Sequence, residues 1–411
     1  MPINEKNLEN RFEFLAEELA EQGVDVGKVM TKLADHEIET PSWGYGNSGT
    51  RFGVFKQPGA ARDVHERLSD AAQVHKLTGS SPAVALHIPW DKVDDFNALT
   101  EEAHDLGIRI GAINPNVFQD ESYKLGSFGH RDRLVRNKAI EHMLECIDIM
   151  KRTGSKVLSL WFADGTNYPG QDDMIRRKHC FQEGLKTTHD ALPEDCRMLI
   201  EYKFFEPAFY HTDVPDWGLA LIFANRTGPK AEVLVDLGHH PLCTNIEHIV
   251  ALLIDENKLG GFHFNNRKYA DDDLTTGSVN LYEVFLIYHE ILNAELAGRR
   301  ANINYMIDQS HIIKPKVEAM IQSVLNIQTA LARALLVDRN ALEVAQKSED
   351  TVACEEILRA AYDTDVRPLL AKMRCEKGAE IDPLSVYRAS GYFDRICAER
   401  KGELAGASSW G

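Results

Sequence analysis

The segment Ala83-Val84-Ala85-Leu86-His87-Ile88 is a short apolar run, and polar, helix-like sequence follows it at 91–106. A second apolar run, Ile108-Arg109-Ile110-Gly111-Ala112-Ile113, comes next and leads into a longer helix-like stretch near 130–152. Apolar runs that alternate with amphipathic stretches predict parallel strands joined by crossover helices. This segment therefore predicts an α/β fold.

The same alternation continues in both directions along the chain. An early extended piece lies near 40–45, and further strand candidates lie at 156–162, 197–203, 232–236, 260–264 and 303–307. About eight strand-plus-helix units predict a closed parallel (β/α)₈ barrel, or TIM barrel, rather than an open sheet.

Helical sequence flanks the predicted barrel on both sides. Helices are expected at 7–21 and 24–36 before it, and at 317–337 and 351–373 after it. We therefore divide the chain into an N-terminal helical segment (1–38), a barrel with the active site (39–337) and a C-terminal helical extension (338–411). The helix at 317–337 closes the barrel in this interpretation, and the extension is a candidate arm for packing on a neighbouring subunit.

Composition limits the classes of function. The 411 residues are 44% hydrophobic and 27% charged, which is typical of a soluble globular protein. No run approaches the roughly 20 apolar residues of a membrane span, and the first residues contain no apolar signal region, so we expect a cytoplasmic protein with no membrane partner. The net charge of −17 argues against a nucleic-acid partner, which requires a basic face. The seven cysteines are widely spaced and are expected to be reduced thiols.

Carboxylates and imidazoles follow four consecutive predicted strands. Active sites of such barrels are built at the C-terminal ends of the strands. The side chains found there are Glu201 and Lys203, then Asp236 and His239, then His263 with Asp271 and Asp273 in the following loop, and finally Asp308. This coincidence is the strongest functional signal in the sequence.

The spacing of these residues has a physical rationale. Glu201 and Lys203 are two apart, so both point to one face of a strand, and a buried lysine beside a carboxylate is costly unless its charge is used. Asp236 and His239 flank Gly238, which allows the chain to turn so that both approach one ion. Mixed carboxylate and imidazole ligands suit Mn²⁺, Mg²⁺ or Co²⁺, and so many donors indicate two ions rather than one.

Each residue alone has an ordinary structural interpretation. A strand-end aspartate such as Asp236 or Asp308 is more often a helix N-cap, and an acidic run such as 271–273 is usually a solvated loop. His263 on an apolar strand is more often a hydrogen-bonded core histidine. Their joint occurrence on successive strand ends favours the metal site.

These segments resemble the metal-site segments of bacterial L-rhamnose isomerases, in particular the branch that tolerates many aldoses, including D-allose. The resemblance runs from about Trp43 to Asp308 and is carried by Ile200-Glu201-Tyr202-Lys203, Val235-Asp236-Leu237-Gly238-His239-His240 and the segment from Phe262-His263-Phe264 to Asp271-Asp272-Asp273. The chain is more distantly similar to xylose isomerase, which shares the Glu-x-Lys and Asp-x-Asp elements.

The resemblance implies a role for each residue. It implies that Glu201, Asp236, His263 and Asp308 hold a structural ion, and that Asp236, as a bridge, holds a catalytic ion with His239, Asp271 and Asp273. Lys203 would polarise the O1 oxygen of the sugar, while Asp308 and Asp273 would orient the water that moves a proton between O1 and O2. Asp236 and His263 stand where xylose isomerase has carboxylates of other lengths, which disfavours a xylose substrate.

The resemblance also implies an activity. It implies an aldose–ketose isomerase that converts L-rhamnose to L-rhamnulose, and D-allose to D-psicose, by a two-metal hydride shift. The cofactors would be two divalent ions per subunit, first of all Mn²⁺, with Co²⁺, Mg²⁺ and Zn²⁺ as alternatives, in a homotetramer. The choice among L-rhamnose, L-mannose, L-lyxose and D-allose stays open, because small contacts give modest discrimination.

Aromatic residues near the strand ends are candidates for sugar binding. Trp43, His87 and Trp161 follow or end predicted strands, and aromatic faces suit the methyl group of a deoxysugar. Plain barrel packing is the alternative for all three. Phe52 lies in a glycine-rich loop which, by the resemblance, would reach a neighbouring subunit's pocket.

One motif is a false match to a cofactor-binding fingerprint. The stretch 44–49 matches the GxGxxG fingerprint, but no helix-forming sequence follows, so we predict a flexible loop and no nicotinamide cofactor.

Two rival functions remain open. A metal-dependent phosphoesterase or endonuclease would use a similar barrel, although the net charge disfavours it. A non-catalytic sugar-binding protein would not need Lys203 beside Glu201.

Overall fold

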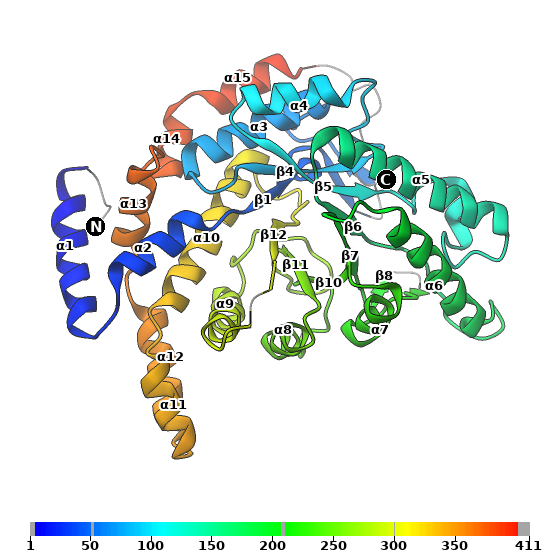
Figure 1. Cartoon of the computed structure of the whole chain (residues 1–411). Coiled ribbons are helices and arrows are strands. Elements are labelled where there is room, and N and C mark those ends of the chain that lie inside the picture. Colours follow the sequence, from blue (N-terminus) through cyan, green and yellow to red (C-terminus); the bar gives the residue numbers. More distant parts are fainter. Residues whose placement is uncertain (1–4, 51–52, 207–209, 300, 402–411) are drawn as a thin grey trace.

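Eight parallel strands form a closed barrel in the computed structural model of the chain, which describes residues 5–50, 53–206, 210–299 and 301–401 (Figure 1). The order around the barrel is β1-β12-β11-β10-β7-β6-β5-β4, and β4 closes the ring by pairing with β1. This arrangement confirms the predicted (β/α)₈ barrel. The strands are β1 (Glu39–Pro41), β4 (Ala83–Ile88), β5 (Arg109–Pro115), β6 (Val157–Leu160), β7 (Arg197–Glu201), β10 (Ala231–Asp236), β11 (Leu259–Phe264) and β12 (Asn304–Ile307).

An α-helix follows each barrel strand and covers the outside of the sheet (Figure 1). Aspartate carboxylates that accept first-turn backbone N–H groups cap the N-termini of several of these helices, as Asp63, Asp132 and Asp173 do. The helices are α3 (Val64–Thr78), α4 (Phe96–Asp105), α5 (Arg133–Thr153), α6 (Met174–Ala191), α7 (Trp217–Thr227), α8 (Ile246–Asp255), α9 (Leu281–Leu296) and α10 (Lys316–Leu335).

The strand sequences alternate between two packed layers. On β4, Val84, Leu86 and Ile88 join the main core, where the helices also contribute side chains. Ala85 belongs instead to a second buried cluster made largely of barrel-strand residues. His87 is on the same face as Ala85 and lines the pocket at the C-terminal end of the barrel, so the period of two carries a polar side chain into the site.

The helices outside the barrel place the N-terminal segment beside part of the C-terminal extension. α1 (Glu5–Glu21) and α2 (Val26–Asp35) precede β1, and α1 packs on α13 (Arg367–Glu376). Ion pairs join Glu9 of α1 to Lys372 of α13 (2.6 Å), and Arg11 of α1 to Asp365 just before α13 (3.1 Å). α11 and α12 project away from the barrel (Figure 1). The extension consists of α11 (Arg339–Lys347), α12 (Thr351–Asp363), α13 (Arg367–Glu376), α14 (Pro383–Ala389) and α15 (Tyr392–Glu399).

Three expected boundaries are wrong. The helix expected at 91–106 begins only at Phe96, and the helix expected at 351–373 is two helices, because Pro368 starts a new first turn. The extended piece expected at 40–45 is β1 followed by a 3₁₀ turn at Ser42–Tyr45. Part of the loop predicted after 44 is a hairpin in which β2 (Ser48–Thr50) pairs with β3 (Gly53–Phe55).

No single helix among the described residues is long and apolar enough to cross a bilayer. Only α10 and α11 together reach that length and composition, as a pair bent by 61°.

Candidate metal centre and active site

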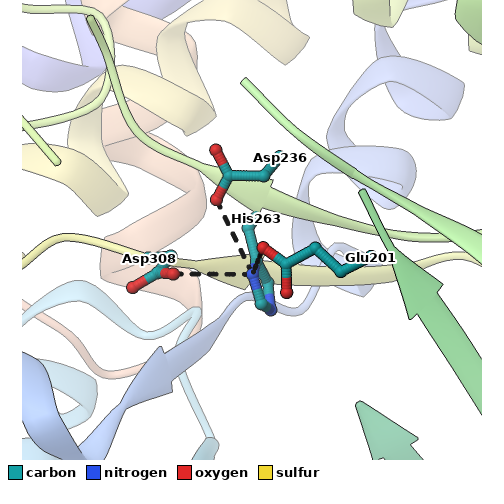
Figure 2. A group of neighbouring side chains, drawn as sticks. All are labelled: Glu201, Asp236, His263 and Asp308. Atoms are coloured by element: carbon teal, nitrogen blue, oxygen red, sulfur yellow. Dashed lines mark hydrogen bonds and ion pairs between the residues drawn. The ribbon is translucent and has the colours of Figure 1, made fainter. Parts of the chain in front are cut away.

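Four side chains from four neighbouring strands converge on one point at the C-terminal end of the barrel. Glu201 ends β7, Asp236 ends β10, His263 lies on β11 and Asp308 follows β12. The Nδ1 atom of His263 lies 3.2 Å from a Glu201 oxygen, 3.7 Å from an Asp236 oxygen and 3.5 Å from an Asp308 oxygen (Figure 2). Ligand atoms that share one ion at about 2.0–2.6 Å have separations of this order.

A second group of donors shares Asp236 with the first. One atom each of Asp236, His239 and Asp271 lie within 4.8 Å of one another, the same limit that the first group meets. The Nδ1 atom of His239 lies 3.0 Å from the backbone oxygen of Tyr202 and 3.2 Å from Glu201, and its Nε2 atom lies 3.4 Å from Asp271. When Nδ1 donates to the Tyr202 carbonyl, Nε2 is free to bind an ion, which is the usual arrangement of a metal-binding histidine.

The turn after β10 is built for this second group. A Cβ atom on Gly238 would lie 2.9 Å from Asp271 Oδ1 and 3.1 Å from Asp236 Oδ1, so a larger residue would displace both carboxylates. Asp271 Oδ1 is buried and makes no hydrogen bond to any described residue. An unpartnered buried carboxylate oxygen is costly, and a cation would satisfy it.

The charges of the site favour cations. Burial raises the pKa of Asp236 to about 7. Burial alone would lower the histidine pKa values, but Asp236 and Asp271 raise the pKa of His239 to about 10, and Glu201, Asp308 and Asp236 raise that of His263 to about 9. Carboxylates thus outnumber the cationic side chains in this buried space, and the donor set fits divalent metal ions.

Lys203 and Asp273 complete the polar lining. Lys203 Nζ lies 2.7 Å from Asp271 and 4.9 Å from the centre of the Trp161 ring. Against the effect of burial, Lys203 and His239 hold the pKa of Asp271 well below its usual range. Asp273 lines the same pocket but belongs to neither group of converging donors, so its role as a ligand stays a prediction.

The aromatic candidates form the wall of the pocket. Trp43 donates its indole N–H to Asp308 at 2.8 Å. His87 stacks on Trp90 with ring centres 3.7 Å apart, and its Nδ1 atom is buried with no hydrogen bond within the described ranges. Trp161 lines the pocket as well, whereas Phe52 lies outside the residues that the structure describes.

Sequence reasoning missed several residues of this pocket, among them Phe118 and Asn114. Phe118 packs edge to face on Trp161 with ring centres 4.7 Å apart, and Asn114, near the end of β5, lines the pocket beside it. Asn114 sits at a strand end and could have been found by the rule that revealed His87. Phe118 lies in the following loop, where no periodicity indicates direction.

Two probable sugar isomerases resemble the chain along nearly its whole length. The chain is 46% identical over 401 residues to a probable sugar isomerase of Rhizobium meliloti, covering 96% of this chain and 93% of that protein. It is 43% identical to a probable sugar isomerase of Mesorhizobium japonicum, covering 98% and 94% of the two chains. No protein-family model matches the chain.

More distant matches carry more specific names. A xylose isomerase of Thermus thermophilus is 26% identical over 61% of this chain and 70% of its own length. An L-rhamnose isomerase of Rhodopirellula baltica is 26% identical over 39% of this chain and 44% of its own length. The solved structure of an L-ribulose 3-epimerase shares the fold, with a TM-score of 0.50 and 15% identity over 77% of this chain and 98% of that one. The chain therefore belongs to the family of sugar isomerases that the two rhizobial proteins represent, within the xylose-isomerase-like superfamily.

Proposed function

We propose that the protein is an aldose–ketose isomerase that converts L-rhamnose to L-rhamnulose and also accepts D-allose and related aldoses. The observation that carries the proposal is the pair of donor groups that share Asp236 beside Lys203. The matches to xylose isomerase and L-rhamnose isomerase support the reaction type. We further propose that it acts in the cytoplasm as a homotetramer.

We assign the donor residues to two ions. Glu201, Asp236, His263 and Asp308 would hold one, and Asp236, His239 and Asp271, joined by Asp273, would hold the other, with Mn²⁺ as the proposed metal. When bound, such ions polarise a carbonyl and lower the pKa of water. By holding such ions, the donor side chains would supply the electrostatic part of the reaction.

The chain's own residues bind and orient the sugar. Isomerisation moves one hydrogen between C1 and C2 and one proton between O1 and O2. Lys203, held by Asp271, would donate a hydrogen bond to O1 as negative charge develops there. Asp308, fixed by the Trp43 indole, and Asp273 would guide the proton between the two oxygens.

The opposite wall of the pocket would bind the rest of the sugar. The unpartnered Nδ1 atom of His87 would bond a sugar hydroxyl, which would satisfy that buried nitrogen. Trp43 and Trp161 would pack against the apolar face and the methyl group of a 6-deoxy sugar.

The test is an isomerase assay on the full-length protein. The protein is stripped with EDTA, then given Mn²⁺ and L-rhamnose, D-allose or D-xylose, and ketose formation is followed. We expect ketose from L-rhamnose and D-allose that EDTA abolishes and Mn²⁺ restores. Absence of ketose from all three sugars, in protein with metal bound, would overturn the proposal.

A further inference from the structure

A buried arginine outside the pocket connects three loops of the catalytic face. Arg177, in the first turn of α6, is 2% exposed and does not appear among the described residues that line the pocket. Its guanidinium contacts the β5–α5 loop at the Leu125 carbonyl (3.2 Å) and the β7–α7 loop at Asp213 (2.6 and 2.8 Å). It also reaches Asp172 (3.3 Å) and Asp164 (3.8 Å) of the β6–α6 loop. We call Arg177, Asp164, Asp172 and Asp213 the loop clamp.

The loop clamp is tied to the backbone of Lys203. One carboxylate oxygen of Asp213, Oδ2, accepts two hydrogen bonds from Arg177, from Nε and Nη2. The neighbours of Asp213 on either side bond Lys203: the Thr212 hydroxyl donates to the Lys203 carbonyl, and the Lys203 N–H donates to the Val214 carbonyl at 3.0 Å. Charge-assisted hydrogen bonds are shorter and stronger than neutral ones, so two of them on one carboxylate oxygen hold Asp213 firmly. The guanidinium therefore fixes the strand end from which Lys203 enters the pocket.

The other side of the clamp holds the segment that follows Trp161. Asp164 accepts hydrogen bonds from the Ser127 N–H (2.7 Å), the Ser127 hydroxyl (2.6 Å) and the Gly129 N–H (2.9 Å), and its carbonyl accepts the Asp213 N–H at 2.8 Å. A Cβ atom on Gly126, whose φ is +113°, would lie 2.6 Å from Asp164 and 2.8 Å from Arg177. The close approach of the β5–α5 loop thus depends on glycine.

We infer that Arg177, acting through Asp213, is a positioning residue that holds Lys203 against Trp161 and Asp271 in the pocket. The inference rests on the proposed isomerase function, because it assigns Arg177 a part in the same reaction. Lys203 is 4% exposed and sits between Asp271 at 2.7 Å and the Trp161 ring at 4.9 Å. A loose strand end would release it from both partners.

The test compares Arg177→Lys and Asp213→Asn with Arg176→Lys as a matched control. Arg176 is the neighbouring arginine and bonds Asp172 and the Gly129 carbonyl, but no bond to the β7–α7 loop is seen within the described ranges. We expect kcat on L-rhamnose to fall roughly 10- to 100-fold in the two clamp variants, with KM and the Mn²⁺ content changed little. Arg176→Lys should keep kcat within about twofold of the unsubstituted protein, since it leaves the Asp213 pair intact.

A second readout does not need catalysis. Metal-free proteins are treated briefly with acetic anhydride, and acetylation of Lys203 is measured by peptide mass spectrometry against the exposed Lys186 in the same sample. Lys203 should react several-fold faster in both clamp variants than in Arg176→Lys. A purely structural role would lower Tm while leaving kcat at 25 °C and Lys203 labelling unchanged, and that result would overturn the inference. If the unsubstituted protein isomerises no sugar, the proposed function fails and the labelling alone decides the inference.

Discussion

Asp236 is the one described residue that belongs to both groups of converging donors, so single substitutions separate the two proposed ions. Asp236→Asn should reduce bound Mn²⁺ from two ions per chain to nearly none, because the amide replaces a charged ligand in both groups. His263→Gln should remove one ion and leave the group of Asp236, His239 and Asp271 loaded. Metal content after dialysis, measured by atomic emission, checks this prediction. Equal loss in both variants would contradict two separable sites.

We expect Lys203 to act on the sugar and not to contribute to metal binding. Lys203→Met keeps the length of the side chain and removes its charge, so kcat should fall by about 10²–10³-fold, as for loss of one electrostatic group in an active site. Mn²⁺ affinity should stay equal or rise, because Asp271 loses the ammonium 2.7 Å away that competes for its charge. Calorimetric titration with Mn²⁺ and steady-state kinetics measure the two effects, with exposed Lys186→Met as control. A parallel loss of metal would assign Lys203 a supporting role in the metal site.

At the level of elements, the order of strands and helices could be predicted from the sequence, because a buried parallel strand reads as an apolar run wherever it occurs. The N-terminal boundary of α4 could not be predicted in this way. The sequence pattern predicts a helix start at Asp91, but the Asp91 carboxylate is buried, lies 2.5 Å from Arg67 and accepts the His87 N–H at 2.7 Å. Asp95 is the actual N-cap. Only the fold reveals which aspartate has a buried partner, and Arg67 lies far away in the sequence.

The site shows the same division between local pattern and tertiary contact. The strand-end positions of Glu201, Asp236 and Asp308 follow from alternation and could be predicted. Phe118 and Arg177 could not, because their partners lie on other loops and no sequence period reports such contacts. The chain after 338 was predicted least well: one helix was expected there, at 351–373, and the described part holds five, of which α11 and α14 begin at the N-caps Asp338 and Asp382.

The two aspartates before α4 should differ in their effect on stability. Asp95→Ala should lower the free energy of unfolding by about 1 kcal/mol, the usual cost of a lost N-cap. Asp91→Ala should cost about 3–5 kcal/mol, because Arg67, 1% exposed, would remain as a buried charge without its carboxylate. Urea unfolding of the metal-free variants measures both values. Equal costs would mean that the Arg67–Asp91 pair contributes no more than a surface cap.

At the scale of the whole molecule, buried neutral histidines make stability depend on pH. His289 of α9 is 7% exposed, and burial, followed by Arg339, lowers its pKa from 6.5 to about 4. The unfolded chain takes up a proton at this site below pH 6.5, and the folded protein does so only near pH 4. This contribution to stability is therefore complete above pH 6.5 and is lost as the pH falls toward 4.

Replacing this histidine should flatten the acid side of the stability curve. The unsubstituted protein should lose roughly 2–3 kcal/mol at this site between pH 7.5 and pH 4.5, whereas His289→Gln cannot lose it. The difference in urea midpoint between the two proteins should accordingly narrow, or change sign, as the pH is lowered. EDTA is kept in all samples so that metal binding does not titrate in the same range, and exposed His104→Gln serves as control. Parallel pH curves for the unsubstituted protein and His289→Gln would show that His289 ionises alike in the folded and unfolded chains. Acid sensitivity would then have to come from other histidines whose pKa is lowered by desolvation, His36 and His311 among them.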